Sequence, residues 1–218
     1  NGYQGTAVVG TVSGTSISFG SETVYETGMA FYNSIVYDST NQKVVIVYSY
    51  ATNGNLGTAI VGTVSGTSIS FGSANVFNSA GTYTTSAVYD SSNQKVVIAY
   101  EDGGNSNYGT AVVGTVSGTS ISFGTPVVFN TAGAGHISIA YDSTNEKVVI
   151  AYADGGNGQK GTAIVGTVSG TSISFGTPVV FNSTDQSDLG GVVYDSTNQK
   201  VVIAYRDYGN SYYGTAIV

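Results

Sequence analysis

The chain has 218 residues, of which 41% are hydrophobic and 9% are charged, with a net charge of −7 and no Cys. This balance argues against nucleic-acid binding and against docking on anionic membranes, because both need clustered Lys and Arg. The lack of Cys excludes a disulfide framework and a thiolate zinc site, and it leaves the cellular compartment open.

The chain begins at Asn1 without a Met and ends within a strand pattern at Val218, as expected for a segment of a longer protein or for a processed one. No apolar run approaches membrane-spanning length and no signal peptide is visible, so no membrane insertion is expected. The 31 Gly and 17 Tyr, with only two Pro, predict a β-rich and turn-rich protein rather than a helical one.

The same eleven residues, Gly-Thr-Val-Ser-Gly-Thr-Ser-Ile-Ser-Phe-Gly, occur four times at intervals of 52 residues. A fixed period of this length is typical of a repeat architecture. We therefore expect one domain, 1–218, built from internal repeats. Their approximate bounds are 5–56, 57–108, 109–160 and 161–213, with a partial strand at 214–218.

Each repeat predicts four strands and no helix. In the third copy a short strand is followed by a turn that opens with Asp142, and a second strand rich in Val and Ile follows. A flexible loop begins at Asp154, and a third strand ends at the two-residue turn Ser169–Gly170. The predicted strands are 137–141, 147–152, 161–168 and 171–175, the last continuing through 178–181.

The second strand is apolar on both faces, as in a strand between two layers, whereas the fourth alternates, as in a half-exposed strand. The sequence therefore predicts an all-β fold, a β-propeller of four four-stranded antiparallel blades, with the ring closed by the N- and C-terminal strands. One strand is then surplus, because residues 5–12 and 214–218 both fit the third place of the shared blade. Either the chain is cut from a longer array, or two chains exchange end strands and form a homo-oligomer.

Strand one, its turn and the Val-Val-Ile-Ala-Tyr of strand two resemble the first strands of blades in many propellers. The longer repeat sequence, from Val-Val-Ile-Ala-Tyr to Gly-Thr-Ser-Ile-Ser-Phe-Gly, also looks like repeat proteins with blades of this length from marine environmental and bacteriophage sequences. That resemblance implies a virion or extracellular surface and supplies no catalytic residues. The Asp-box of sialidases, the Trp-Asp signature of WD40 blades and the calcium pattern of integrin-type blades are all missing from this sequence.

The repeats differ mainly in the segments expected on one face of the ring, which we call the variable segments. The turns expected on the opposite face are nearly constant, with Ser92 and Glu146 as exceptions. Drift would affect both faces alike, so the pattern favours a binding face. Its Tyr, Asn, Asp and Ser resemble a paratope in composition and suit sugars. The variable segments are 49–56, 101–108, 153–160 and 206–213 after strand two, and 26–33, 78–85, 130–137 and 182–189 before strand one.

His136 is the only His, so no ring of His exists for a metal; it either lines the mouth of the channel or is incidental. Arg206, the only Arg, either pairs with a carboxylate or is solvated. Three Asp residues share one repeat position, where they could hold a cation or sugar hydroxyls or simply open a Gly-rich turn. A further Asp, present in every copy, is expected to cap the constant turn. These two sets are Asp102, Asp154 and Asp207, and Asp38, Asp90, Asp142 and Asp195.

The leading functional hypothesis is a non-enzymatic module that binds a carbohydrate or another surface receptor through the variable segments. The alternatives are a structural or oligomerisation domain of a virion or surface fibre and, third, a glycan-active enzyme. No catalytic residue, cofactor or metal site is predicted. The predicted ligand-binding residues are Tyr32, Tyr50, Tyr83, Asp102, Asn105, Tyr108, His136, Asp154, Asn157, Asp188, Arg206, Asp207, Tyr208 and Asn210.

Overall fold

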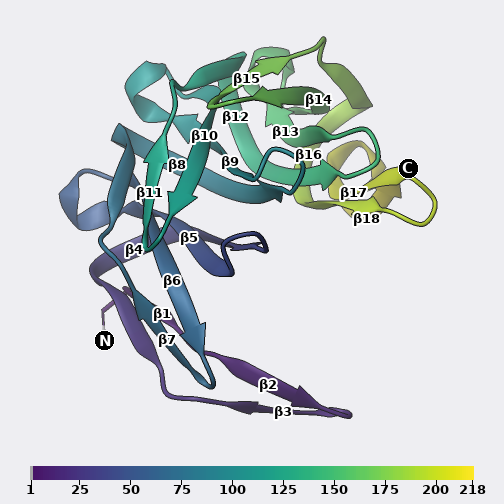
Figure 1. The fold of residues 1–218 in the computed structure, drawn as a ribbon. Helices are drawn as coiled ribbons and strands as arrows, with labels where there is room; N and C mark the ends of the chain where they lie inside the picture. The colour runs from purple at the N-terminus through teal and green to yellow at the C-terminus, as the bar shows by residue number, and fades with distance from the viewer. Residues whose placement is uncertain (1) are drawn as a thin grey trace.

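The computed structural model describes residues 2–218 and shows an all-β protein of antiparallel strands with four short 3₁₀ helices (Figure 1). Four long strands each begin in one repeat unit and end in the next. These are β4 (Thr23–Asp38), β8 (Asn75–Asp90), β12 (Val127–Asp142) and β16 (Val179–Asp195).

The remaining elements recur between the long strands in a fixed order. Before β4 lie β1 (Gln4–Ala7), β2 (Gly10–Ser13) and β3 (Ser16–Phe19). After β4 come β5 (Lys43–Tyr50), η1 (Ala51–Asn53), β6 (Leu56–Ser65) and β7 (Ser68–Phe71). After β8 come β9 (Lys95–Asp102), η2 (Gly103–Asn105), β10 (Tyr108–Ser117) and β11 (Ser120–Phe123). After β12 come β13 (Lys147–Asp154), η3 (Gly155–Asn157), β14 (Lys160–Ser169) and β15 (Ser172–Phe175), and after β16 come β17 (Lys200–Asp207), η4 (Tyr208–Asn210) and β18 (Tyr213–Ile217).

Pairing divides the chain into repeated four-stranded meanders. Unit 1 consists of residues 30–38 of β4, then β5, β6, and an outer strand made of β7 and residues 75–81 of β8. Unit 2 runs in the same way from residue 82 to residue 133, and unit 3 from residue 134 to residue 186. The C-terminal unit contains residues 187–195 of β16 with β17 and β18, and the N-terminal unit contains β1, β2, β3 and residues 23–29 of β4.

The sheet is open, whereas the sequence predicts a closed ring of four blades. Sixteen strands form one sheet that starts at β1, ends at β18 and follows the long strands from unit to unit. β18 pairs with β17 along the edge where the N-terminal strand would have closed the ring, and β1 pairs with β4. The short connection through η4 places β18 at this edge with little loss of chain entropy, while closure from the N-terminus spans the whole chain.

The segments expected as loops before strand one are parts of the long strands. Each long strand has a register shift along its length. In β4, β8 and β12 one residue there takes a left-handed backbone conformation: Tyr32, Thr84 and His136 have φ of 50°, 47° and 50°. This is the geometry of a β-bulge, which turns the strand without ending it. The fourth strand continues past residue 178 as predicted but is interrupted, since β15 ends at Phe175 and the outer edge resumes at Val179 of β16.

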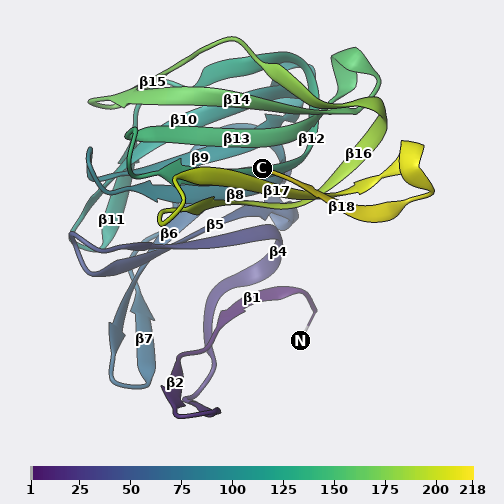
Figure 2. The same ribbon diagram turned by 90° about the vertical axis from the view of Figure 1, so that its right-hand side faces the viewer.

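Successive units pack face to face, as the layers in Figure 2 show. Val45, Val47 and Val61 of unit 1 lie in one buried cluster with Ile98 and Tyr100 of unit 2. The equivalent face of unit 2 packs on unit 3. The Val-Val-Ile-Ala-Tyr strands β9 and β13 are apolar on both faces because each lies between two such interfaces, whereas β17, in the last unit, leaves Ala204 exposed.

The constant turns are closed by the Asp that begins each of them, as the sequence predicts. Asp142 Oδ1 accepts hydrogen bonds of 3.0 Å from the N–H groups of Thr144 and Asn145, and its Oδ2 accepts one of 2.7 Å from Asn145 Nδ2. Asp195 repeats the pattern, and the Asn198 side chain lowers the pKa of its carboxyl. Such Asx-turns explain why every copy keeps this residue.

Two of the Tyr residues that precede these Asp residues tie their unit to the preceding one. Tyr89 Oη donates to Thr40 Oγ1 at 2.7 Å, and Tyr194 Oη donates to Thr144 Oγ1 at 2.5 Å. The expected hairpin turn is also present, but displaced by one residue. Gly170 and Thr171 are its central residues, and the φ of +61° at Gly170 matches a type II′ turn.

Candidate functional site

The variable segments meet at the bends of the long strands. Each 3₁₀ helix lies against the long strand that precedes it, and residues just after η1 and η3 bond to the next long strand. The Thr82 N–H donates to the Asn55 carbonyl at 2.9 Å, and the Ser187 N–H donates to the Gln159 carbonyl at 3.0 Å. These backbone bonds hold the segment after strand two against the segment before strand one. The two groups of variable segments therefore form common surfaces, although the second group belongs to strands.

The three Asp residues at the shared position are engaged by the scaffold itself. Asp154 Oδ1 accepts from the Gly156 N–H at 3.0 Å, capping η3, and from Asn130 Nδ2 at 3.0 Å. Asp102 and Asp207 cap η2 and η4 in the same way, with Asn78 and Asn182 as their amide partners. Each carboxylate therefore has a structural partner from the preceding long strand.

The first repeat changes both members of this pair. Glu26 stands where the other copies have the Asn, and Tyr50 stands where they have the Asp. Glu26 Oε1 accepts from the Gly28 N–H at 2.9 Å and its Oε2 accepts from Tyr48 Oη at 3.1 Å, while η1 has no side-chain cap. The joint replacement fits a pair that holds the segment together.

A polar cluster forms around Asp188, which lies just before the register shift of β16. His136 Nε2 lies 3.2 Å from Asp188 Oδ1, and Arg206 donates to Asp188 Oδ2. Tyr208 Oη donates to the same oxygen at 3.1 Å, and Arg206 stacks 4.9 Å from the centre of the Tyr208 ring. The hydrogen bond to Asp188 raises the pKa of Arg206. Four predicted site residues, distant in sequence, thus come together.

A polar cavity of about 460 Å³ opens beside this cluster. Burial raises the pKa of the Glu101 carboxyl, which contributes to its wall. Its lining comes from units 2 and 3 and from the C-terminal unit, and all of it lies within the variable segments. The lining residues are Thr84, Glu101, Gly133, Gly135, His136, Gln159, Gln186, Ser187 and Asp188.

The other predicted residues are spread around this cavity or away from it. Tyr83 is paired with Glu101 across β8 and β9, so both side chains lie on one face of the sheet. Tyr32 meets the Tyr83 ring edge-on at 6.1 Å, and Tyr108 begins β10. Tyr50 precedes η1 in unit 1. The exposed residues at the ends of η2, η3 and η4 are Asn105, Asn157 and Asn210.

All residues that line the cavity lie within the variable segments, but several of them are not among the residues predicted from sequence. Glu101, Gln159 and Gln186 lie within the variable segments, yet the choice of residues favoured Tyr, Asn and Asp. A sequence signal for these residues exists, because each occurs in only one copy of the repeat at its position. The residues are Glu101, Gln159 and Gln186.

The cavity offers hydrogen-bonding groups of both kinds. Two carboxylates accept hydrogen bonds, two amides both donate and accept, and two hydroxyls do the same. Within residues 2–218, no three His, Asp or Glu side chains are grouped as metal ligands, and no helix is long and apolar enough to cross a membrane. The arrangement can hold a small polar molecule by many directed hydrogen bonds.

Fold and site together define an all-β protein of antiparallel repeats with a polar cavity on its variable segments. No protein-family model matches the sequence, and a search of the curated proteins finds no match. The chain is similar in fold to a protein from Lactobacillus plantarum of known crystal structure, with a TM-score of 0.54 and 12% identity. The match covers 98% of this chain and 66% of the other, so the chain spans about two-thirds of that protein's length. At this identity the likeness concerns the fold alone.

Proposed function

We propose that the chain is a non-enzymatic recognition module that binds a neutral carbohydrate in the polar cavity beside Asp188. The repeated units serve as propeller-type blades, and the variable segments at their bends supply the ligand contacts. The observation that carries the proposal is that a polar cavity of about 460 Å³ is lined entirely by segments in which the repeats differ. That volume lies within the range of roughly 300–1,000 Å³ that is usual for small-molecule sites.

The chemistry of the lining favours a polyhydroxylated ligand. Sugar hydroxyls donate and accept at once, and the lining pairs acceptors, Glu101 and Asp188, with amides that do both, Gln159 and Gln186. Arg206 already pairs with Asp188, which suits an uncharged ligand better than a cation. Tyr83, on the same face as Glu101, offers a ring on which a sugar C–H face could stack.

A glycan array followed by calorimetry with the best saccharide tests the proposal. Glu101→Gln and Gln159→Ala should each weaken binding by about tenfold, as expected for the loss of one good hydrogen bond of about 1.4 kcal/mol in a buried site. Glu146→Gln is the matched control, because Glu146 lies in a constant turn and hydrogen-bonds Ser92. Binding that is the same in all three variants, or no saturable binding on a broad array, contradicts the proposal.

A further inference from the structure

The β14–β15 hairpin shows how the eleven-residue repeat packs inside the fold. Val168 and Ile173 are 6% and 3% exposed, and the Phe175 ring lies 5.7 Å from the Phe129 ring. The hairpin belongs to unit 3 but buries its apolar face on β10 and β12 of unit 2. We call the apolar surface that receives it the hairpin seat; in unit 2 it is formed by Val97, Ala111, Val113 and Phe129.

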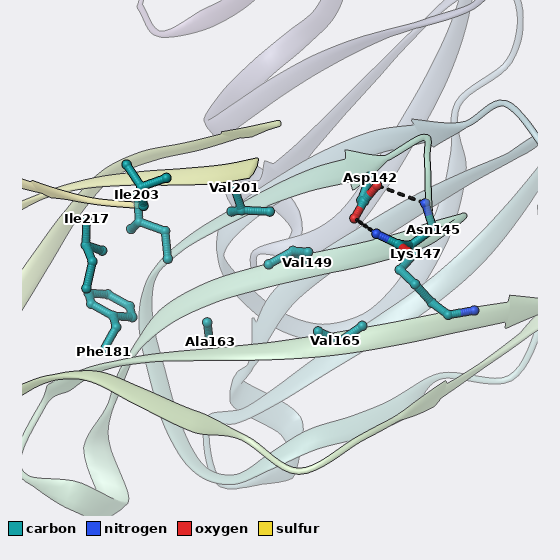
Figure 3. Close-up of a pocket in the computed structure, with 11 residues that line it drawn as sticks. Asp142, Asn145, Lys147, Val149, Ala163, Val165, Phe181, Val201, Ile203 and Ile217 are labelled. Carbon is teal, nitrogen blue, oxygen red and sulfur yellow. Dashed lines mark hydrogen bonds between the residues drawn. The ribbon is translucent and has the colours of Figure 1, made fainter. Parts of the chain in front are cut away.

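Unit 3 carries the same seat, residue for residue, 52 positions later. There it lines an apolar cavity of about 580 Å³, whose other wall is Val201, Ile203 and Ile217 of the C-terminal unit (Figure 3). Val165 of this seat is 46% exposed, whereas Val113 at the equivalent position of unit 2 is 1% exposed. The seat residues of unit 3 are Val149, Ala163, Val165 and Phe181.

The N-terminal copy of the hairpin has the same sequence and is not packed. β2 and β3 form a separate two-stranded sheet that extends away from the rest of the fold (Figure 1). Val12, Ile17 and Phe19 are 71%, 53% and 63% exposed. An isolated two-stranded hairpin is at best marginally stable in water, and its exposed apolar face is typical of an interaction surface.

We propose that the β2–β3 hairpin of a second copy of this chain docks in the hairpin seat of unit 3. The fit is demonstrated inside the chain, because an identical hairpin occupies an identical set of seat residues on unit 2. The chain's own hairpin is held elsewhere: β1 is paired with β4, and Figures 1 and 2 both place β2–β3 at the opposite end of the fold from β14.

The contact is head-to-tail, since the hairpin at one end of a copy meets the seat at the other end of the next. Such a heterologous contact leaves one hairpin and one seat available on every pair of copies. Assembly therefore continues until the rotation between copies closes a ring, or it extends as a filament.

Sedimentation velocity with complementary variants tests this arrangement. Phe19→Asp charges the hairpin and leaves the seat intact, and Val165→Asp charges the seat and leaves the hairpin intact. Both positions are exposed in the single chain, so Asp should be tolerated, and far-UV circular dichroism checks the fold. Ile17→Asp and Ile217→Asp serve as second variants of each surface. Ser18→Asp is the matched control, because Ser18 lies in the same strand but on its other face.

The wild-type chain and Ser18→Asp should form species larger than a monomer, in amounts that rise with concentration. Phe19→Asp and Val165→Asp should each sediment as monomers, and their equimolar mixture should give a dimer and nothing larger, because only one hairpin and one seat remain competent. A wild-type chain that stays monomeric at every concentration overturns the proposal. So does Phe19→Asp that assembles like the wild type, a mixture that stays monomeric, or a loss of assembly in Ser18→Asp.

Discussion

Two isoleucines in identical eleven-residue sequences provide a direct test of the open sheet. Ile17 and Ile173 occupy the same position of β3 and β15, flanked by the same Ser residues. Ile173 is 3% exposed within the cluster that joins units 2 and 3, whereas Ile17 is 53% exposed in the separate hairpin. The same substitution, Ile→Ala, therefore compares two environments with local sequence held constant.

Ile173→Ala should lower the free energy of unfolding by about 3 kcal/mol, within the range of roughly 2–5 kcal/mol for Ile→Ala in a packed core. The loss combines the transfer of the missing carbons with the cavity left against Val113 and Phe129. Ile17→Ala should cost less than about 0.5 kcal/mol, as for other exposed positions.

Urea denaturation at low protein concentration, where copies do not associate, measures both values. Tyr fluorescence and far-UV circular dichroism should be followed together, because a repeat protein can unfold unit by unit and then show transitions that do not coincide. Equal losses for the two variants at every concentration would mean that the N-terminal hairpin is packed within its own chain. That result would refute the open sheet.

Buried hydroxyls, an amide pair and a desolvated carboxyl allow three further tests by denaturation. Within residues 2–218 the buried Tyr100 hydroxyl has no hydrogen-bond partner, so Tyr100→Phe should leave the free energy of unfolding unchanged or raise it by up to about 1 kcal/mol. Tyr48→Phe should instead lower it by about 1–2 kcal/mol, because it removes a hydrogen bond to the Glu26 carboxylate. A loss of stability in Tyr100→Phe would contradict this. Asn130→Ala should cost about 1–2 kcal/mol because it leaves Asp154 without its amide partner, and an Asp154→Ala background should reduce that cost. Burial raises the pKa of the Glu101 carboxyl in the folded protein, so the stability that the protonated carboxyl contributes is present below its ordinary pKa and is lost as the pH rises through the raised pKa. Glu101→Gln should therefore be more stable than the wild type at neutral pH and equally stable at acidic pH.

The strands could be predicted from sequence because their signals are local. The Val-Val-Ile runs, the Asp that opens each constant turn and the Gly of each hairpin act within a few residues of their own position. Closure of the sheet has no such local signal. It depended on whether β1 or β18 pairs with β17, and two segments with the same Gly-Thr-Ala pattern cannot be ranked by pattern alone.

The prediction of loops at the bends is wrong for a related reason. Residues 130–137 are rich in Gly and Ala, a composition typical of a loop, yet they continue β12 because both neighbours, β10 and β13, supply ladder partners. The left-handed residue is His136 in β12 but Tyr32 in β4 and Thr84 in β8, so the position carries no consistent residue signal.

The candidate site could be located by face but not by residue. Comparing the copies singled out the variable segments, and the cavity lies within them. Composition then favoured Asp154 and its equivalents, which are engaged by Asn residues 24 or 25 positions earlier. The joint change to Glu26 and Tyr50 in the first copy was the visible sign of that pairing.

The two proposals reinforce each other through valency. The polar cavity needs Glu101, His136, Gln159 and Asp188 from three successive units, so residues 2–218 form one such site despite the four repeats. Head-to-tail assembly would place many copies of that site on one particle, and a second binding event on a glycan-coated surface would then be intramolecular. Phe19→Asp should therefore bind a free saccharide as well as the wild type does, because residue 19 is remote from the cavity, and should dissociate much faster from a dense glycan surface. If Phe19→Asp and the wild type dissociate from that surface at equal rates, assembly does not strengthen binding to the surface. The hairpin would then have a purely structural role.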